Sequence, residues 1–211
     1  MLDLPTKHGG GPRGPYAKGE LRRAQILKAA FDAFATVGYR NASLLQMASD
    51  CGVTRTALLH YFPTKEILLE AVLAERDRKA DELFFADAPE ASSDGLTYFS
   101  RLLKVVEHNS RNPGIVSLFA VLSTEASDSS HPAHGYFIAR YERALSRTKA
   151  ALGDLSARSL IRPHVELEGL EHDIIALIDG LQVQWLLQPS KIDMAARLRA
   201  RLREVVSVDI P

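Results

Sequence analysis

The polar side chains with the clearest chemical potential lie between residues 51 and 62, in the segment CGVTRTALLHYF. Thr54, Arg55, Thr56 and His60 stand there among apolar residues, and helical spacing would bring them to one face. Their hydroxyl, guanidinium and imidazole groups donate hydrogen bonds, and a guanidinium fits the paired acceptors on a guanine edge. The segment is therefore either a surface that recognises hydrogen-bond acceptors or the solvated face of an ordinary helix.

The residues around this segment have the spacing of two short helices that cross closely. Met47, Ala48 and Cys51 fall three, four and seven positions after Leu44, so one face of a first helix carries all four. The small Ala48 allows a second helix to approach. Gly52 stands where a tight turn is expected, because glycine adopts a left-handed backbone conformation at little cost.

The second short helix is expected to have a buried side and an exposed side. Val53 fills the corner, and Thr54 caps the helix through its side-chain oxygen. The inner face is formed by Ala57, Leu58 and either Tyr61 or Phe62. The small residue, the turn glycine, the apolar positions and the cap all occur at the spacing of a helix–turn–helix, a motif that inserts its second helix into the major groove. This agreement favours that motif over a generic helical hairpin.

The charge distribution supports contact between the first third of the chain and an anionic polymer. The whole chain has no net formal charge, but residues 1–65 hold nine basic residues against four acidic ones. The remainder is correspondingly acidic. A non-specific architectural DNA-binding protein is usually basic throughout, so this distribution argues against that class.

The periodicity predicts an all-α chain of about nine helices, with no strand-like alternation. We expect a flexible basic arm at 1–17, a helix–turn–helix domain at 18–65, and a larger helical ligand-binding and dimerisation domain at 66–211. The predicted helices cover residues 18–37, 44–51, 55–61, 65–85, 94–110, 114–127, 132–152, 167–187 and 192–206.

The compartment is expected to be the cytoplasm. A single cysteine, Cys51, excludes an internal disulfide and suits a reducing environment. No apolar run approaches the length of about 20 residues that spans a bilayer, and the N-terminus lacks a signal-peptide core.

Residues 18–70 resemble the DNA-binding domain of the TetR family of bacterial transcriptional repressors. The resemblance rests on the stretch AQILKAAFDAFATVGYRNASLLQMASDCGVTRTALLHYFPTKEILLEAVL. Ser43 matches the family's first hydroxyl, and Lys65 its lysine after the second short helix. Between them, Met47-Ala48 matches the family's Ile-Ala pair, Cys51-Gly52-Val53 its turn, and His60-Tyr61-Phe62 the end of its second short helix. Leu59 departs from the pattern, because the family commonly has there a Tyr that touches the DNA backbone.

The rest of the chain resembles, more loosely, an actinobacterial-type subgroup of TetR ligand-binding domains. The stretches that carry this are STEASDSSHPAHGYFIARYERAL and ALIDGLQVQWLLQPSKIDMAARL. The resemblance implies an all-α subunit whose last two helices form a four-helix bundle with a partner. It also implies a cavity for a small effector, whose binding moves the helix after the helix–turn–helix and releases DNA.

The residues expected to contact double-stranded DNA are Ser43, Thr54, Arg55, Thr56, His60, Tyr61 and Lys65. Arg55 suits a guanine edge, and the hydroxyls suit phosphates or a thymine methyl. Lys65 at a helix start favours a phosphate. In the arm, Arg13 could enter the minor groove, although such tails are more often simply disordered.

A homodimer on a palindromic operator is expected from the two C-terminal helices. The apolar positions assigned to the interface are Leu177, Leu181, Trp185, Leu198 and Leu202. Two antiparallel helices with excess apolar surface favour a dimer over ordinary monomer core.

An effector pocket is expected in the larger domain. Its candidate residues are Phe99, Leu103, Phe119, Leu122, Phe137, Tyr141 and Gln182. Each could equally be core, and a pocket of this composition suggests a largely apolar small molecule.

Metal or cofactor chemistry is not expected. His131 and His134, with Glu125 before them, have spacing that could bind a metal, but Pro132 also makes this an ordinary helix start. The alternative function, an all-α small-molecule carrier or enzyme, lacks a recognisable nucleophile–base pair, and Gly9-Gly10-Gly11 does not open a phosphate-binding helix.

Overall fold

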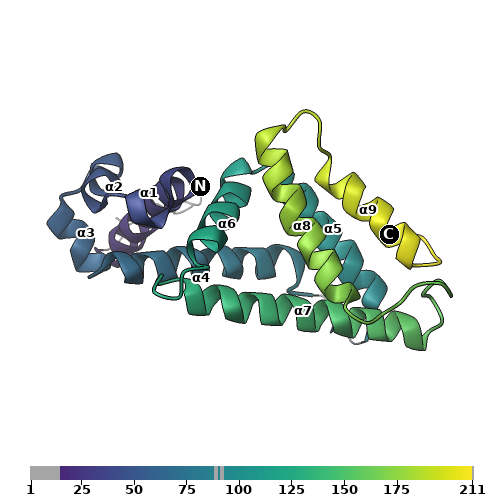
Figure 1. Ribbon diagram of the computed structural model, residues 1–211. Coiled ribbons are helices and arrows are strands. Elements are labelled where there is room, and N and C mark those ends of the chain that lie inside the picture. Colours follow the sequence, from purple (N-terminus) through teal and green to yellow (C-terminus); the bar gives the residue numbers. More distant parts are fainter. Residues whose placement is uncertain (1–14, 88–89, 91–92, 211) are drawn as a thin grey trace, which may run out of the picture.

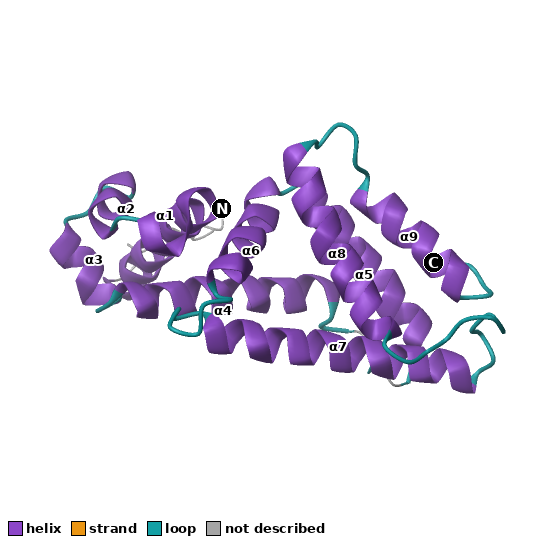
Figure 2. Cartoon of the chain, viewed as in Figure 1, coloured by secondary structure: helices purple, strands orange, loops and turns teal. Residues whose placement is uncertain are grey.

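The computed structural model describes residues 15–87, 90 and 93–210, and all its named elements are helices (Figures 1 and 2). In chain order they are α1 (Pro15–Asn41), α2 (Leu44–Asp50), α3 (Arg55–Tyr61), α4 (Lys65–Phe84), α5 (Gly95–Ser110), α6 (Pro113–Glu125), α7 (His134–Ala157), α8 (Leu170–Leu187) and α9 (Met194–Val205). The all-α prediction is confirmed, and most helix ends lie within a few residues of the predicted ones.

Two of the helix ends that differ from the predicted bounds have a clear local cause. Helix α1 begins at Pro15, inside the predicted arm, because proline is well suited to a first helical turn. Helix α7 runs past Gly153 to Ala157, because Leu152 and Leu155 are buried on either side of that glycine and their packing outweighs its poor helix propensity. Residues 1–14 of the predicted arm, Arg13 included, lie outside the described residues.

The apolar side chains form two clusters. The first joins α1–α4 to α6 and the start of α7, with Phe34, Leu58 and Phe119 among its members. The second joins α5, the rest of α7, α8 and α9. The first cluster thus continues past the predicted boundary at residue 65, and α6 packs directly on α1. That boundary stays a prediction.

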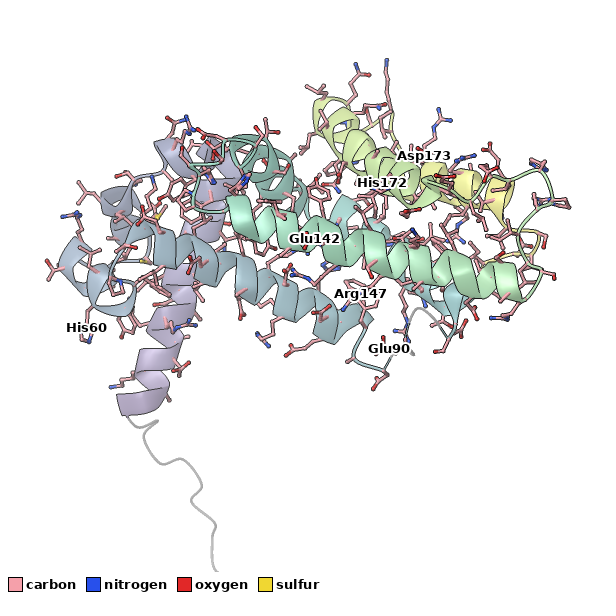
Figure 3. All side chains as sticks on the ribbon, turned by 60° about the horizontal axis from the view of Figure 1, so that its bottom comes forward. His60, Glu90, Glu142, Arg147, His172 and Asp173 are labelled. Atoms are coloured by element: carbon pink, nitrogen blue, oxygen red, sulfur yellow. The ribbon has the colours of Figure 1, made fainter. Side chains whose placement is uncertain are left out.

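The two short helices α2 and α3 lie at one end of the molecule, and α8 and α9 lie at the other (Figure 1). Helix α4 starts beside α3 and runs alongside α7 toward the second cluster, so it connects the two ends (Figures 1 and 3). None of the described helices is long and apolar enough to cross a membrane.

Candidate nucleic-acid interface

The two short helices are fixed at their N-termini by side-chain caps. Ser43 Oγ accepts a hydrogen bond from the Gln46 amide at 3.4 Å, and Thr54 Oγ1 accepts one from the Ala57 amide at 3.1 Å. Between the helices, Gly52 has a φ of 65°, the left-handed conformation expected of the turn glycine. These local bonds set the angle at which α3 leaves α2.

The inner face of the pair is held against α1. Leu58 is 0% exposed and Phe62 is 2% exposed, so Phe62, not the half-buried Tyr61, provides the inner aromatic ring. The Arg22 guanidinium donates to the Cys51 carbonyl at 3.0 Å, and the Arg23 guanidinium lies over the Phe62 ring at 5.2 Å. Apolar burial and two arginines thus anchor α2 and α3 from behind.

The outer face of α3 carries the polar groups singled out from the sequence. Thr54, Arg55, Thr56 and His60 are all exposed, and His60 projects from the outer end of the molecule (Figure 3). Within the described part of the chain, Arg55 makes no ion pair or hydrogen bond. Its donors are therefore free to bind acceptors on another molecule.

Lys65 lies differently from the other predicted contacts. It is half-buried, with Nζ 4.6 Å from the centre of the Tyr39 ring and donating to the Arg40 carbonyl at 3.4 Å. Burial lowers the pKa of Lys65. The side chain is thus engaged at the end of α1, and reaching a phosphate would require it to rotate away.

The single cysteine is part of the hairpin's framework. Cys51 Sγ lies 3.1 Å from the Met47 carbonyl, and burial raises the pKa of the thiol, which keeps it protonated. A protonated thiol is a poor nucleophile.

The end of α1 is tied both to α4 and to the segment that follows α6. At the kink in α1, Gly38 has a φ of 75° and a ψ of 176°, and the next amide, that of Tyr39, donates to Glu125 Oε2 at 2.7 Å. The Tyr39 hydroxyl donates to Glu66 Oε1 at 2.6 Å. Arg40 forms an ion pair with Asp128. This junction connects the α2–α3 pair to α6 and α7.

The residues weighed as metal ligands have other partners at this junction. His131 Nδ1 accepts from the Ala133 amide at 3.1 Å, and His134 Nδ1 lies 2.8 Å from the Ala126 carbonyl. His131 also packs edge-on against Tyr39, with ring centres 4.9 Å apart. Over the described residues, no group of three His, Cys, Asp or Glu side chains could hold a metal ion. His134 is the first residue of α7, and His131 lies in the turn before it.

The residues predicted for the dimer interface are mostly internal. Leu181, Trp185, Leu198 and Leu202 are buried within one chain, between α5, α8 and α9, and only Leu177 is partly buried. The prediction used periodicity, which does not distinguish contact with a neighbouring helix from contact with a partner chain. The apolar side chains that α8 exposes are Val183, at 50%, and Leu187, at 77%.

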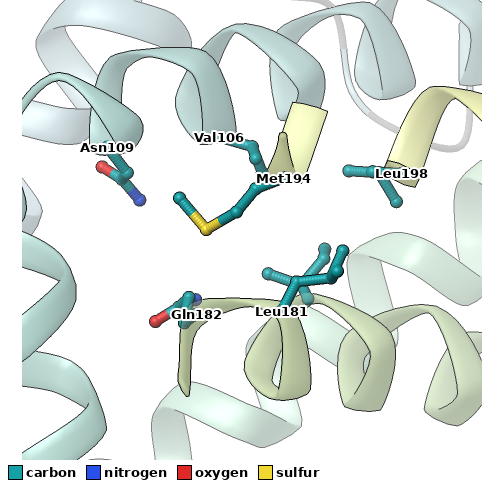
Figure 4. Close-up of a pocket in the computed structure, with 7 residues that line it drawn as sticks. Val106, Asn109, Leu181, Gln182, Met194 and Leu198 are labelled. Atoms are coloured by element: carbon teal, nitrogen blue, oxygen red, sulfur yellow. The ribbon is translucent and has the colours of Figure 1, made fainter. Parts of the chain in front are cut away.

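The residues predicted for the effector pocket do not surround one space. Phe99 and Leu103 are buried in the second cluster, whereas Phe119, Leu122 and Phe137 are buried in the first, with Tyr141 packed against it. Gln182 lines a small cavity between α5, α8 and α9 (Figure 4). Its volume of about 10 Å³ is about enough for one water molecule.

A much larger cleft lies between α1, α4 and the adjoining parts of α5 and α6. Its volume is about 720 Å³, and none of the predicted pocket residues lines it. Its walls include the apolar Phe31 and Phe84 and the charged Glu75 and Arg76. The sequence did not reveal it, because the facing residues on α1 and α4 are far apart along the chain and no local pattern links them.

Comparisons with known proteins agree with this arrangement. Residues 26–72 match the family model described as bacterial regulatory proteins, tetR family. The HTH-type transcriptional regulator BetI of Cronobacter sakazakii is 31% identical over 186 residues, which cover 84% of this chain and 87% of that protein.

Solved structures share the fold. A transcriptional regulator from Saccharomonospora viridis in complex with choline superposes with a TM-score of 0.72 at 22% identity, covering 89% of this chain and 98% of that one. The SmeT–triclosan complex, from Stenotrophomonas maltophilia, gives a TM-score of 0.70 at 17% identity, covering 88% and 92%. With the helix–turn–helix geometry above, the match to BetI over 84% of this chain places it in the TetR family of DNA-binding bacterial transcriptional regulators.

Proposed function

We propose that this chain is a repressor that binds a palindromic operator as a homodimer and leaves it when a small molecule binds. The observation that carries the proposal is the outer face of α3, where four exposed polar side chains stand on a helix fixed from behind. Two such helices related by a two-fold axis would read two half-sites of one palindrome.

The roles of the polar residues follow from their exposure. Arg55 donates to a guanine edge, while Thr54, Thr56 and His60 contact phosphates or neighbouring bases. Ser43 and Tyr61 flank this face and contact the DNA backbone. Lys65 contributes a phosphate contact after its Nζ leaves the Tyr39 ring, so its contribution is smaller than that of an unengaged lysine.

Release by an effector is supported by the fold relatives that were solved with choline and with triclosan. In this chain the junction at Tyr39 offers the mechanical link, because Glu125 and Asp128 hold the end of α1, and Tyr39 binds Glu66 at the start of α4, which follows α3. An effector that shifts α6 or α4 would therefore move the recognition helix. The dimer would use the exposed side of α8.

The test is operator selection followed by substitution. The full chain is first used to select its binding sequence from random duplex DNA. Arg55→Ala should then weaken binding to the selected site by about 1–3 kcal/mol and relax preference at one base pair. Lys65→Ala should weaken selected and random duplexes alike.

Arg111→Ala is the matched control, because Arg111 is an exposed arginine at the C-terminal end of α5, outside the helix–turn–helix. It should leave both affinities unchanged. If Arg55→Ala lowered affinity for selected and random duplexes equally, Arg55 would not read a base. If the chain selected no sequence at all, the proposed function itself would be wrong.

A further inference from the structure

Helices α4 and α7 are connected by charged side chains along their shared length. On α4 these are Arg76, Asp77 and Asp81, and on α7 they are Arg140, Arg143 and Arg147. We call this set the α4–α7 seam. Asp77 lies 3.3 Å from Arg140 and 3.8 Å from Arg143, and Asp81 lies 3.9 Å from Arg147, which projects from α7 in Figure 3.

The seam has too few carboxylates for its guanidinium groups. Asp77 is the ion-pair partner of three arginines: Arg76 at 3.2 Å, Arg140 and Arg143. Its carboxylate also accepts a hydrogen bond from the Tyr136 hydroxyl at 2.9 Å. The Arg76 side chain is only 10% exposed. A buried cation without a full counter-charge is costly, so Arg76 gains from further negative charge, whereas Arg140 and Arg143, at 33% and 55% exposed, are also hydrated.

The carboxylate of Asp179 does not form an ion pair with these arginines within the described chain. Asp179 on α8 accepts a hydrogen bond from the Tyr141 hydroxyl at 2.8 Å, and no described ion pair joins it to an arginine. Burial raises the pKa of Asp179, while the hydrogen bond from Tyr141 and the charge of Arg140 oppose the shift. Asp179 therefore interacts with the charge of Arg140 without forming an ion pair with it.

An aromatic ring beside the seam is occupied by the same cations. The guanidinium carbons of Arg76 and Arg140 lie over the Phe119 ring, 4.1 Å and 4.2 Å from its centre. A cationic ligand gains its affinity from such rings, and here it would meet two fixed positive charges instead. The site is thus unfavourable for a quaternary ammonium and favourable for an anion.

The most buried arginine of the seam also borders open space. Arg76 is one of the residues that line the cleft of about 720 Å³ between α1, α4, α5 and α6. That volume lies within the range of small-molecule pockets, and its walls combine apolar and charged side chains. Of the seam residues only Arg76 lines the cleft, so a ligand in the cleft meets the seam at this side chain and has room for an apolar body.

We propose that the effector is an organic anion whose carboxylate takes the place of Asp77 on Arg76, Arg140 and Arg143. This inference rests on the proposed function, since it names the chemical class of the effector and where its charged group binds. Displacing Asp77 breaks its ion pairs with Arg140 and Arg143 and leaves Asp81–Arg147 as the described ion pair between α4 and α7. Because α4 follows α3 directly, a shift of α4 is transmitted to the α2–α3 pair.

Chemical rescue tests whether the arginines accept an external carboxylate. Asp77→Ala removes the internal carboxylate and leaves space, so sodium acetate should raise its thermal unfolding midpoint relative to sodium chloride at equal ionic strength. At saturating acetate the expected rise is about 3–6 °C. The rise should level off with concentration, as binding to one site requires.

Two matched variants control for general salt effects. Asp77→Asn removes the charge but keeps the volume filled, so acetate should not rescue it. Asp81→Ala removes an exposed carboxylate with a single arginine partner, and acetate should not rescue it either. No rescue of Asp77→Ala, or equal rescue of all three variants, overturns the inference.

The wild-type chain gives an independent measurement if Asp77→Ala does not fold. Sodium benzoate should raise the unfolding midpoint of the wild type but not that of Arg140→Gln, whereas choline chloride should raise neither. Stabilisation by choline without stabilisation by benzoate would overturn the anionic class. In that outcome specific operator binding by the wild type would still support the proposed function, so the two can fail separately.

Discussion

At the scale of single residues, burial separates the side chains that build the α2–α3 pair from those that read DNA. Leu58 and Phe62 are buried against α1, while Arg55 is exposed and unpaired within the described chain. This division was predictable from the sequence, because residues three and four positions apart on a helix share a face.

The positions of other residues were not predictable in this way. Lys65 lies on the Tyr39 ring, and Arg76 and Arg140 lie over Phe119, although each partner is distant along the chain. A local pattern gives the side of a helix but not which distant residue faces it. For the same reason the predicted pocket residues divide between two clusters.

His131 gives a prediction for pH dependence. Burial lowers the pKa of His131, chiefly by penalising the charged form, and Arg40 lowers it further, while Glu125 and Asp128 oppose the shift. The unfolded chain therefore binds the proton more readily than the folded chain. Stability from this group is complete above the unfolded pKa of about 6.5 and falls as pH drops below it.

The measurement is the urea midpoint of the wild type and of His131→Asn between pH 8 and pH 5. The asparagine side chain keeps an oxygen for the Ala133 amide but does not titrate, so the wild type should lose more stability than the variant below a pH of about 6.5. The other histidines cancel in the difference. Parallel curves for the two proteins would contradict the prediction.

At the scale of elements, the kink in α1 sets how the first helix meets α6. Gly38 was expected to end the helix, and the helical conformation does break there, but a further turn continues to Asn41. The prediction missed this turn because it is held from outside, by the Glu125 carboxylate on the Tyr39 amide. Helix-capping rules consider only residues close in sequence, so they do not predict a hydrogen bond to a carboxylate as distant along the chain as Glu125.

Gly38→Ala should therefore be destabilising. Its φ of 75° with a ψ of 176° is a conformation that essentially only glycine adopts, and an added Cβ would lie 2.5 Å from Glu125 Oε1. We expect the free energy of unfolding to fall by about 1–3 kcal/mol, and operator binding to weaken because the Tyr39 junction is disturbed. Urea unfolding and a DNA titration measure the two effects.

Gly153→Ala is the control for that substitution. Gly153 is an exposed helical residue in α7 with open space around its Cα, so alanine there should raise the free energy of unfolding by up to about 1 kcal/mol. If Gly38→Ala left the free energy of unfolding unchanged while Gly153→Ala raised it, a side chain at the kink would not cause strain, and the prediction would be wrong.

At the scale of the whole molecule, the exposed apolar side chains of α8 mark the surface expected to pair with a second copy. Val183 and Leu187 are one helical turn apart on α8, and this helix lies at the end of the molecule away from α3 (Figure 1). The sequence predicted that α8 and α9 form the dimer interface, and the proposed dimer keeps α8. The side of α8 that it uses is different, because the most regular apolar stripe of this helix packs within the chain.

Leu187→Glu should convert the dimer to a monomer and lower operator affinity by at least about tenfold, about 1.4 kcal/mol, because each half-site is then bound alone. Sedimentation and a DNA titration measure these changes. The fold should be unaffected, since Leu187 is already exposed. Leu83→Glu, at an exposed leucine on α4, should leave the oligomeric state unchanged. A dimeric Leu187→Glu would place the interface elsewhere.

The first apolar cluster has a consequence for how the protein loses its activity. Because Leu118, Phe119 and Leu122 of α6 complete the core beneath α1–α4, the DNA-reading helices cannot melt separately from the part that is proposed to sense the effector. We expect one cooperative transition for both. Damage deep in α6 would then abolish repression as completely as damage to α3, and a fragment cut after α4 would not keep a folded α2–α3 pair.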